Sequence, residues 1–197
     1  ETVTVRMKDM KEIFGILAIT LGISAAVPYI FGILKKSVQP HRISWAIWSF
    51  ISLVTLTSYV SSGAHWSALL AVAAALNNFV IFFLALKFGT GGASIQDRIA
   101  LGIAIVGIVL WILTRQAAFG LVFALCADFV GLVLTLKKAH KDPASESALA
   151  WAMAVIASSF GLLAVHKYNF TQTIYPVYAI ASGLCLFLVS MIGRKAK

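Results

Sequence analysis

Asp128 is the residue whose type and position most clearly suggest chemistry. It lies near the middle of an apolar run, Phe119–Leu136, that is long enough to cross a bilayer core. An ionisable group at that depth costs several kcal/mol to insert, so it usually faces a cavity or a partner. Asp128 could couple to a proton or bind a cationic or hydroxyl-rich molecule. A structural role, as a hydrogen-bond partner of Tyr29, Asn77 or a serine on a neighbouring helix, stays open.

Two adjacent asparagines, Asn77 and Asn78, form a second polar feature inside an apolar run. Neighbouring helical residues point about 100° apart. One amide can therefore face the interior of a helical bundle while the other makes a bond between helices, which is common in membrane proteins. Tyr29, Tyr175 and Tyr178 are further candidates, with packing as the alternative for each.

A third feature is a string that is written twice, KKSVQPHRISWAIW at 35–48 and KKAHKDPASESALAW at 137–151. Both copies contain a Lys pair followed by P-x3-S-x3-W. The matched residues are Pro40 and Pro143, Ser44 and Ser147, and Trp48 and Trp151. Proline suits the first turn of a helix, and residues four apart share a face. The pattern predicts two proline-started helices, each with a Ser/Trp stripe.

The paired tryptophans Trp48 and Trp151 lie inside the apolar runs, so we expect them to flank a pocket or a gate. An interfacial aromatic belt is the alternative, and it suits Trp45 and Trp66 better. Ser44 and Ser147 share the stripe, although either could bond back to a helix carbonyl.

Enzymatic and metal sites are not indicated. The four histidines, His41, His65, His140 and His166, stand in expected loops without a metal-ligand spacing, and we expect them to be solvated. Ser–His–Asp sets, phosphate-binding glycine loops and paired acids are absent from the sequence. Cys126 and Cys185 lie within apolar runs and are expected to pack as small apolar residues. We therefore expect no catalysis, no cofactor and no metal.

Composition places the chain in a membrane. Of its residues, 60% are hydrophobic and 12% are charged, whereas a soluble domain is nearer half apolar and a quarter charged. The mean hydropathy is +0.93. The net charge of +9 is better explained by membrane topology than by nucleic-acid binding, because basic and aromatic residues do not alternate in any polar segment.

Seven apolar runs predict seven transmembrane helices joined by short loops, so the expected fold class is all-α membrane protein. The runs are Ile13–Leu34, Ile43–Val60, Trp66–Leu86, Ile99–Leu113, Phe119–Leu136, Ala148–Val165 and Ile174–Ile192. With an odd number of spans, eleven Lys and Arg residues fall on one side and five on the other. The positive-inside rule then predicts a multi-pass protein of the cell membrane with its N-terminus outside and its C-terminus cytoplasmic.

The spacing of the repeated string predicts an internal duplication. Its copies are separated by about four helices, so both point the same way. A first three-helix repeat (13–89), a linker helix (97–114) and a second three-helix repeat (118–193) account for this as a 3+1+3 parallel arrangement, a plan known in transporters.

Several stretches resemble the SWEET/PQ-loop superfamily of transporters. Val27-Pro28-Tyr29-Ile30, followed by Lys35-Lys36-Ser37, is similar to the end of that family's first helix and the basic loop after it. Leu76-Asn77-Asn78-Phe79 resembles the place of a substrate-contacting asparagine, and Ser182 stands at the corresponding place in the second repeat. The resemblance implies hinge roles for prolines, here Pro28, Pro40 and Pro143. The PQ dipeptide itself is missing, since Gln39-Pro40 has the reverse order. The motif P-H-x-x-S-W at 40–45 is also similar to a group of bacterial seven-helix proteins.

These features together favour a transporter or facilitator that moves a small polar solute, sugar-like by resemblance, by alternating access, with or without proton coupling. The expected partners are that solute and the lipid bilayer, with no nucleic acid; a monomer, dimer or trimer all stay open. The expected solute-contacting residues are Asn77, Asn78, Asp128, Ser182, Trp48, Trp151, Ser44, Ser147, Tyr29 and Tyr178. A non-transporting receptor or assembly protein, a vitamin-precursor transporter and an amino-acid transporter are the alternatives.

Overall fold

The computed structural model describes residues 2–92, 94–114 and 117–195. Within these ranges the chain is helical and contains no β-strand. The elements are α1 (Thr2–Leu34), α2 (Arg42–Ser61), α3 (Ala68–Phe88), α4 (Ile95–Thr114), α5 (Ala117–Lys141), the 3-10 helix η1 (Pro143–Ser145), α6 (Ala148–Leu163) and α7 (Phe170–Lys195). The all-helical class expected from the sequence is confirmed.

Each predicted apolar run overlaps one α-helix, but several helices are longer than their runs. The helix α1 begins at Thr2 rather than near Ile13, and α5 continues past Leu136 to Lys141. Hydropathy marks only the apolar part of a helix. Lysine and glutamate are good helix formers, so charged flanks can continue the same helix beyond that part.

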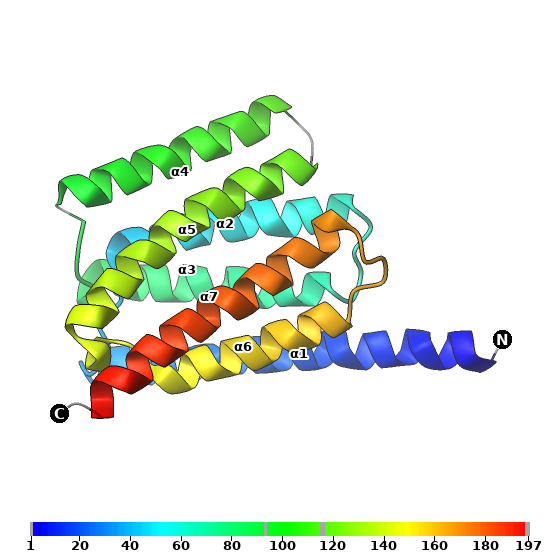
Figure 1. Cartoon of the computed structure of the whole chain (residues 1–197), viewed down its shortest axis with the longest axis horizontal. Helices are drawn as coiled ribbons and strands as arrows, with labels where there is room; N and C mark the ends of the chain where they lie inside the picture. The colour runs from blue at the N-terminus through cyan, green and yellow to red at the C-terminus, as the bar shows by residue number, and fades with distance from the viewer. Residues whose placement is uncertain (1, 93, 115–116, 196–197) are drawn as a thin grey trace.

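The helices lie side by side along the long axis of the molecule (Figure 1). The helix α4 contacts α5 and α2 and stands at one edge of the bundle, with α1 and α6 together near the opposite edge (Figure 1). The remaining helices, α2, α3, α5 and α7, lie between these edges. Among the described residues, those that line a central cavity belong to the other helices and not to α4.

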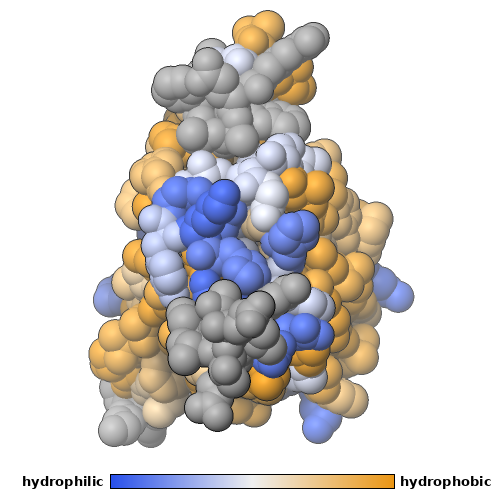
Figure 2. Space-filling model, turned by 90° about the vertical axis from the view of Figure 1, so that its right-hand side faces the viewer, coloured by the Kyte–Doolittle hydropathy of each residue, from blue (hydrophilic) through white to orange (hydrophobic). Residues whose placement is uncertain are grey.

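Long apolar helices suggest that the protein is embedded in a membrane. Among the described residues, four helical segments are long and apolar enough to cross a bilayer, and α6 is a shorter apolar helix; the four are Asp9–Leu34, Arg42–Ser61, Ala68–Phe88 and Phe170–Ile192. Large apolar side chains face outward, for example Phe83 at 64% and Leu113 at 72% exposure. Figure 2 shows hydrophilic residues gathered on one end of the molecule between hydrophobic flanks, as lipid contact would require.

The prediction of two proline-started helices is wrong in detail. Pro40 precedes α2, which begins at Arg42 with His41 as its N-cap. Pro143 does start a helix, but it is the short η1, and α6 begins later with Ser147 as its N-cap. In the two copies of the string, the proline therefore lies at different distances from the first residue of the α-helix. The reason is that a capping side chain, not the proline, determines where each α-helix begins.

His41 joins the first loop to the first turn of α4 and to the loop before it. Its Nε2 lies 3.3 Å from Asp97 Oδ1, while its Nδ1 accepts a hydrogen bond of 3.4 Å from the Ser44 backbone N–H. Gly91 lies directly against the ring: it has φ +80°, and a Cβ there would lie 2.3 Å from His41 Nε2. His41 is only 8% exposed, so the expectation that it is a solvated loop residue is wrong.

Acidification is expected to destabilise the protein through His41. Burial lowers the pKa of His41 below its ordinary value, although Asp97 acts in the opposite direction. The unfolded chain therefore binds a proton more readily than the fold, and this stabilisation is lost as the pH falls below about 6.5. Between about pH 7.5 and about pH 5.5, the Tm of the wild type should fall more than that of His41→Asn.

The control for this prediction is His140→Asn, which alters an exposed histidine near the end of α5. Its Tm should follow the pH profile of the wild type. Parallel profiles for the wild type and His41→Asn would show that His41 does not couple folding to protonation.

Candidate functional site

A cavity of about 160 Å³ lies between α1, α2, α3, α5, α6 and α7. A cavity of roughly that size can hold a molecule such as benzene. Its wall is largely alanine, glycine and leucine, with two further groups of side chains. The polar group is Asn77, Asn78, Asp128, Ser158 and Ser182, and the aromatic group is Tyr29, Trp45, Trp48, Trp151, Tyr175 and Tyr178. Among the described residues of the lining, only Asp128 carries a charge.

Asp128 is held in place from two helices. The Tyr178 hydroxyl of α7 donates a 2.7 Å hydrogen bond to Asp128 Oδ2. The Trp48 indole N–H of α2 lies 3.4 Å from the backbone carbonyl of Asp128. Its hydrogen-bond partner is therefore Tyr178 rather than the residues considered from the sequence. In the part of the chain that the structure describes, no lysine, arginine or histidine forms an ion pair with this carboxylate.

Asn77 and Asn78 both line the cavity, and both bond across to another helix. Asn77 Nδ2 donates to the Gly22 carbonyl of α1 at 2.6 Å. Asn78 Nδ2 donates to the Trp48 carbonyl of α2 at 3.0 Å. We expected one amide to face the interior and the other to bond to a neighbouring helix, and this expectation is wrong. Each amide lines the cavity and also donates one hydrogen bond to a neighbouring helix.

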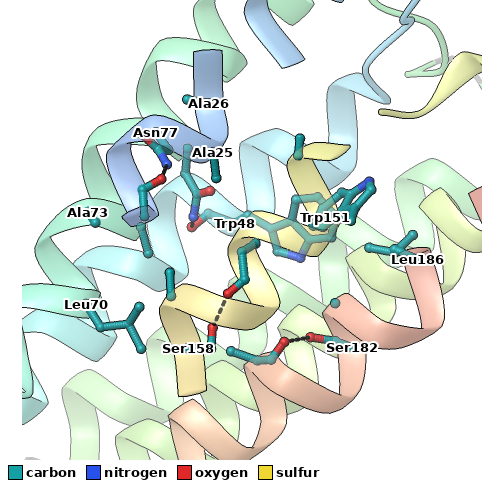
Figure 3. A pocket seen from close by; sticks show the side chains of 18 of the residues that line it. Ala25, Ala26, Trp48, Leu70, Ala73, Asn77, Trp151, Ser158, Ser182 and Leu186 are labelled. Carbon is teal, nitrogen blue, oxygen red and sulfur yellow. Dashed lines mark hydrogen bonds between the residues drawn. The ribbon is translucent and has the colours of Figure 1, made fainter. Parts of the chain in front are cut away.

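Four aromatic rings form one cluster on the wall. The Trp48 and Trp151 ring centroids are 6.0 Å apart, and Figure 3 shows the two indoles next to each other among the residues that line the cavity. The Trp45 centroid lies 5.0 Å from that of Trp48 and 5.2 Å from that of Tyr29. Trp45 is 5% exposed, so its assignment to an interfacial belt is wrong. Its ring packs against Tyr29 and the other indoles, inside the bundle.

The remaining predicted residues divide into two groups. Ser182 lines the cavity and donates to the Ala179 carbonyl of its own helix. Ser44 and Ser147 do not line it: Ser44 Oγ donates to the Gly131 carbonyl at 2.8 Å, and Ser147 Oγ accepts from the Ala150 N–H. These serines position helix α2 and the start of α6, so the structure separates them from the tryptophans of their stripe.

The three prolines proposed as hinges have different surroundings. Pro28 lies inside α1, where it removes a backbone hydrogen bond and is a natural place for a bend. Pro40 is fully buried in the first loop, and Pro143 opens η1. Pro176 lies inside α7 and was not singled out from the sequence.

A network around Lys138 joins the two Lys-pair loops. Lys138 Nζ pairs with Glu146 Oε1 and also donates to the backbone carbonyl of Gln39. The Gln39 N–H donates to the Ser145 carbonyl at 3.0 Å. Glu146 Oε2 accepts a 2.9 Å hydrogen bond from the Trp151 indole N–H. Because Trp151 lines the cavity, this network connects the wall of the cavity directly to the contact between the loops.

The opposite end of the bundle has a smaller set of contacts. The Tyr59 hydroxyl donates to the Gln172 carbonyl at 2.8 Å, and Gln172 Nε2 donates to the Ser62 carbonyl at 3.2 Å. Tyr175, a cavity residue, lies edge-on to Tyr59 with centroids 6.0 Å apart. Contacts between α2 and α7 thus border the cavity at this end.

Sequence reasoning missed Glu146 and Ser158. Glu146 is 0% exposed, yet it precedes the apolar run of α6 and so has the pattern of an ordinary loop acid. One signal could have identified it: Glu146 lies five residues before Trp151, and its counterpart in the first copy is the apolar Ile43. Ser158 had no such signal.

Comparison of the chain with protein-family models, with curated proteins and with solved structures gave no match.

Proposed function

We propose that this chain is a multi-pass membrane transporter or facilitator that moves a small polar solute through the central cavity by alternating access. The observation that carries the proposal is the cavity itself, which is lined from six helices and contains a single carboxylate, Asp128. A carboxylate at membrane depth marks a solute or proton path more often than a structural contact.

The pattern of helix contacts supports an internal duplication. Within the first three-helix repeat, α1 to α3, the helix α3 contacts both α1 and α2. Within the second repeat, α5 to α7, the helix α7 contacts both α5 and α6. Between the two repeats, the contact of α1 with α6 corresponds to the contact of α5 with α2. In the same way, the contact of α3 with α6 corresponds to the contact of α7 with α2. Exchanging α1, α2 and α3 for α5, α6 and α7 leaves this pattern unchanged. Two similar halves around one site are what a rocking mechanism requires.

The two ends of the cavity supply candidate gates. In the proposed cycle, the Lys138–Glu146 network opens on one side and the Tyr59–Gln172 contact opens on the other. Following the positive-inside rule, we place the Lys138 end and the C-terminus in the cytoplasm. Trp151 lines the cavity and donates a hydrogen bond to Glu146, so solute binding and gate opening would be coupled through one side chain.

A bulky side chain introduced into the cavity, here called a plug, is expected to abolish flux of the solute. Ala154→Trp adds an indole to the cavity wall on α6, whereas Leu149→Trp adds the same ring at a position of the same helix that is 62% exposed. Uptake of labelled sugars, amino acids and amines is measured in proteoliposomes, with and without a pH gradient. The wild type and Leu149→Trp should transport at least one solute class, and Ala154→Trp should not.

Thermal unfolding confirms that each variant is folded, and Ala179→Trp on α7 serves as a second plug. Transport that continues through both folded plugs would show that the cavity is not the path. Solute binding by the wild type without any flux would instead favour a receptor or assembly protein. A response to the pH gradient distinguishes proton coupling from uniport.

A further inference from the structure

In its described part, the cavity wall carries negative charge and no positive charge, which favours a ligand that is a cation. Asp128 is the charged side chain among the described lining residues, and the lining contains no lysine, arginine or histidine. A lone carboxylate in a low-dielectric site attracts a cation and repels an anion. The hydrogen bond from Tyr178 stabilises the carboxylate without supplying a positive charge.

The aromatic residues provide the matching surface. One continuous cluster contains Tyr29, Trp45, Trp48 and Trp151. The indole N–H of Trp48 also lies 3.4 Å from the backbone carbonyl of Asp128, and both residues line the cavity. Ring faces attract organic cations, and tryptophan is the most effective of the aromatic side chains. Aromatic walls next to one carboxylate are the arrangement that proteins use to hold methylated or protonated amines.

Some of the hydrogen-bond donors of the wall are committed to other protein groups. One N–H of each asparagine, Asn77 and Asn78, and the hydroxyl of Ser182 bond to helix carbonyls. The indole N–H groups of Trp48 and Trp151 bond to a carbonyl and to Glu146. A neutral, hydroxyl-rich solute needs free donors as well as acceptors, whereas a cation needs only acceptors and ring faces. Among the described lining residues, Tyr29 Oη and Trp45 Nε1 have no hydrogen-bond partner, so the preference for a cation rests on Asp128 and the aromatic rings rather than on the donors.

We infer that the solute of this cavity is a small monovalent organic cation, a protonated or quaternary amine, with Asp128 as its counter-ion and the Trp48/Trp151 pair as its aromatic wall. The cavity volume of about 160 Å³ limits the ligand to a few heavy atoms beyond the ammonium group. This inference deepens the proposed function and rests on it for the movement of that cation across the membrane.

The test compares choline with 3,3-dimethylbutan-1-ol, which has the same shape but carbon in place of the charged nitrogen. Binding to the full chain in lipid nanodiscs is measured by tryptophan fluorescence and calorimetry, with tetramethylammonium and glucose as further probes. Choline or tetramethylammonium should bind at least about tenfold more tightly than the neutral isostere.

Four variants test the assigned roles. Asp128→Asn should weaken cation binding by about tenfold or more, with little effect on the isostere, and Asp142→Asn, on an exposed loop acid, should bind like the wild type. Trp48→Phe should retain most of the cation affinity that Trp48→Leu loses.

Equal affinity for choline and its isostere, absence of saturable binding of either cation, or preferential binding of glucose would overturn the inference. Flux in proteoliposomes of the same preparation separates it from the proposed function. Transport of a neutral solute without cation binding rejects the inference alone. Cation binding without flux rejects transport and leaves the binding site in place.

Discussion

Asp128→Asn is expected to reduce solute flux by about 10- to 100-fold while leaving the fold intact. Asparagine has the same shape, and its Oδ1 can still accept the Tyr178 hydrogen bond of 2.7 Å, so the contact between α5 and α7 survives. What is lost is the charge that faces the cavity. A charge-assisted hydrogen bond contributes about 1.5–3 kcal/mol, which corresponds to the stated range of rates. Uptake in proteoliposomes measures the effect.

Two comparisons make this prediction specific. Asp142→Asn applies the same substitution to an exposed acid and should leave flux unchanged. Tyr178→Phe keeps the charge of Asp128 but removes its hydrogen bond, so its effect should be smaller than that of Asp128→Asn. Wild-type flux in a folded Asp128→Asn protein would remove Asp128 from the transport path.

Lys138→Met is expected to lower the free energy of unfolding by about 3 kcal/mol, or the Tm by roughly 6–12 °C for a chain of this size. The substitution keeps the length of the side chain but leaves the carboxylate of Glu146, which is 0% exposed, without its cation. It also removes a donor to the Gln39 carbonyl, which helps to join the two loops. Thermal unfolding followed by circular dichroism measures the loss.

The neighbouring lysine provides a matched control. Lys137→Met makes the same substitution at an exposed position and should change the Tm little. The double variant Lys138→Met/Glu146→Gln removes both charges and keeps an acceptor for the Trp151 indole N–H, so it should recover most of the lost stability. If Lys138→Met is as stable as Lys137→Met, the pair does not hold the loops together.

Sequence alone determined the helical class and the approximate place of each helix, and it singled out Asp128 as an acid inside an apolar run. These properties depend on local composition, because a long apolar run predicts a helix wherever it packs, and an acid inside such a run is unusual in any fold. The Trp48/Trp151 pair was also found from the sequence, since a repeated string preserves spacing between copies.

Only the tertiary structure decided which side chains share the cavity and which act between helices. Trp45 faces its neighbours Tyr29 and Trp48 rather than lipid, and Ser44 bonds to α5 rather than to a solute. Glu146, an ordinary loop acid by its sequence, is buried against Lys138 and Trp151. Each of these outcomes depends on how far a helix is rotated and where it begins. Rotation and capping are set by contacts with distant segments, which a local pattern of residues does not contain.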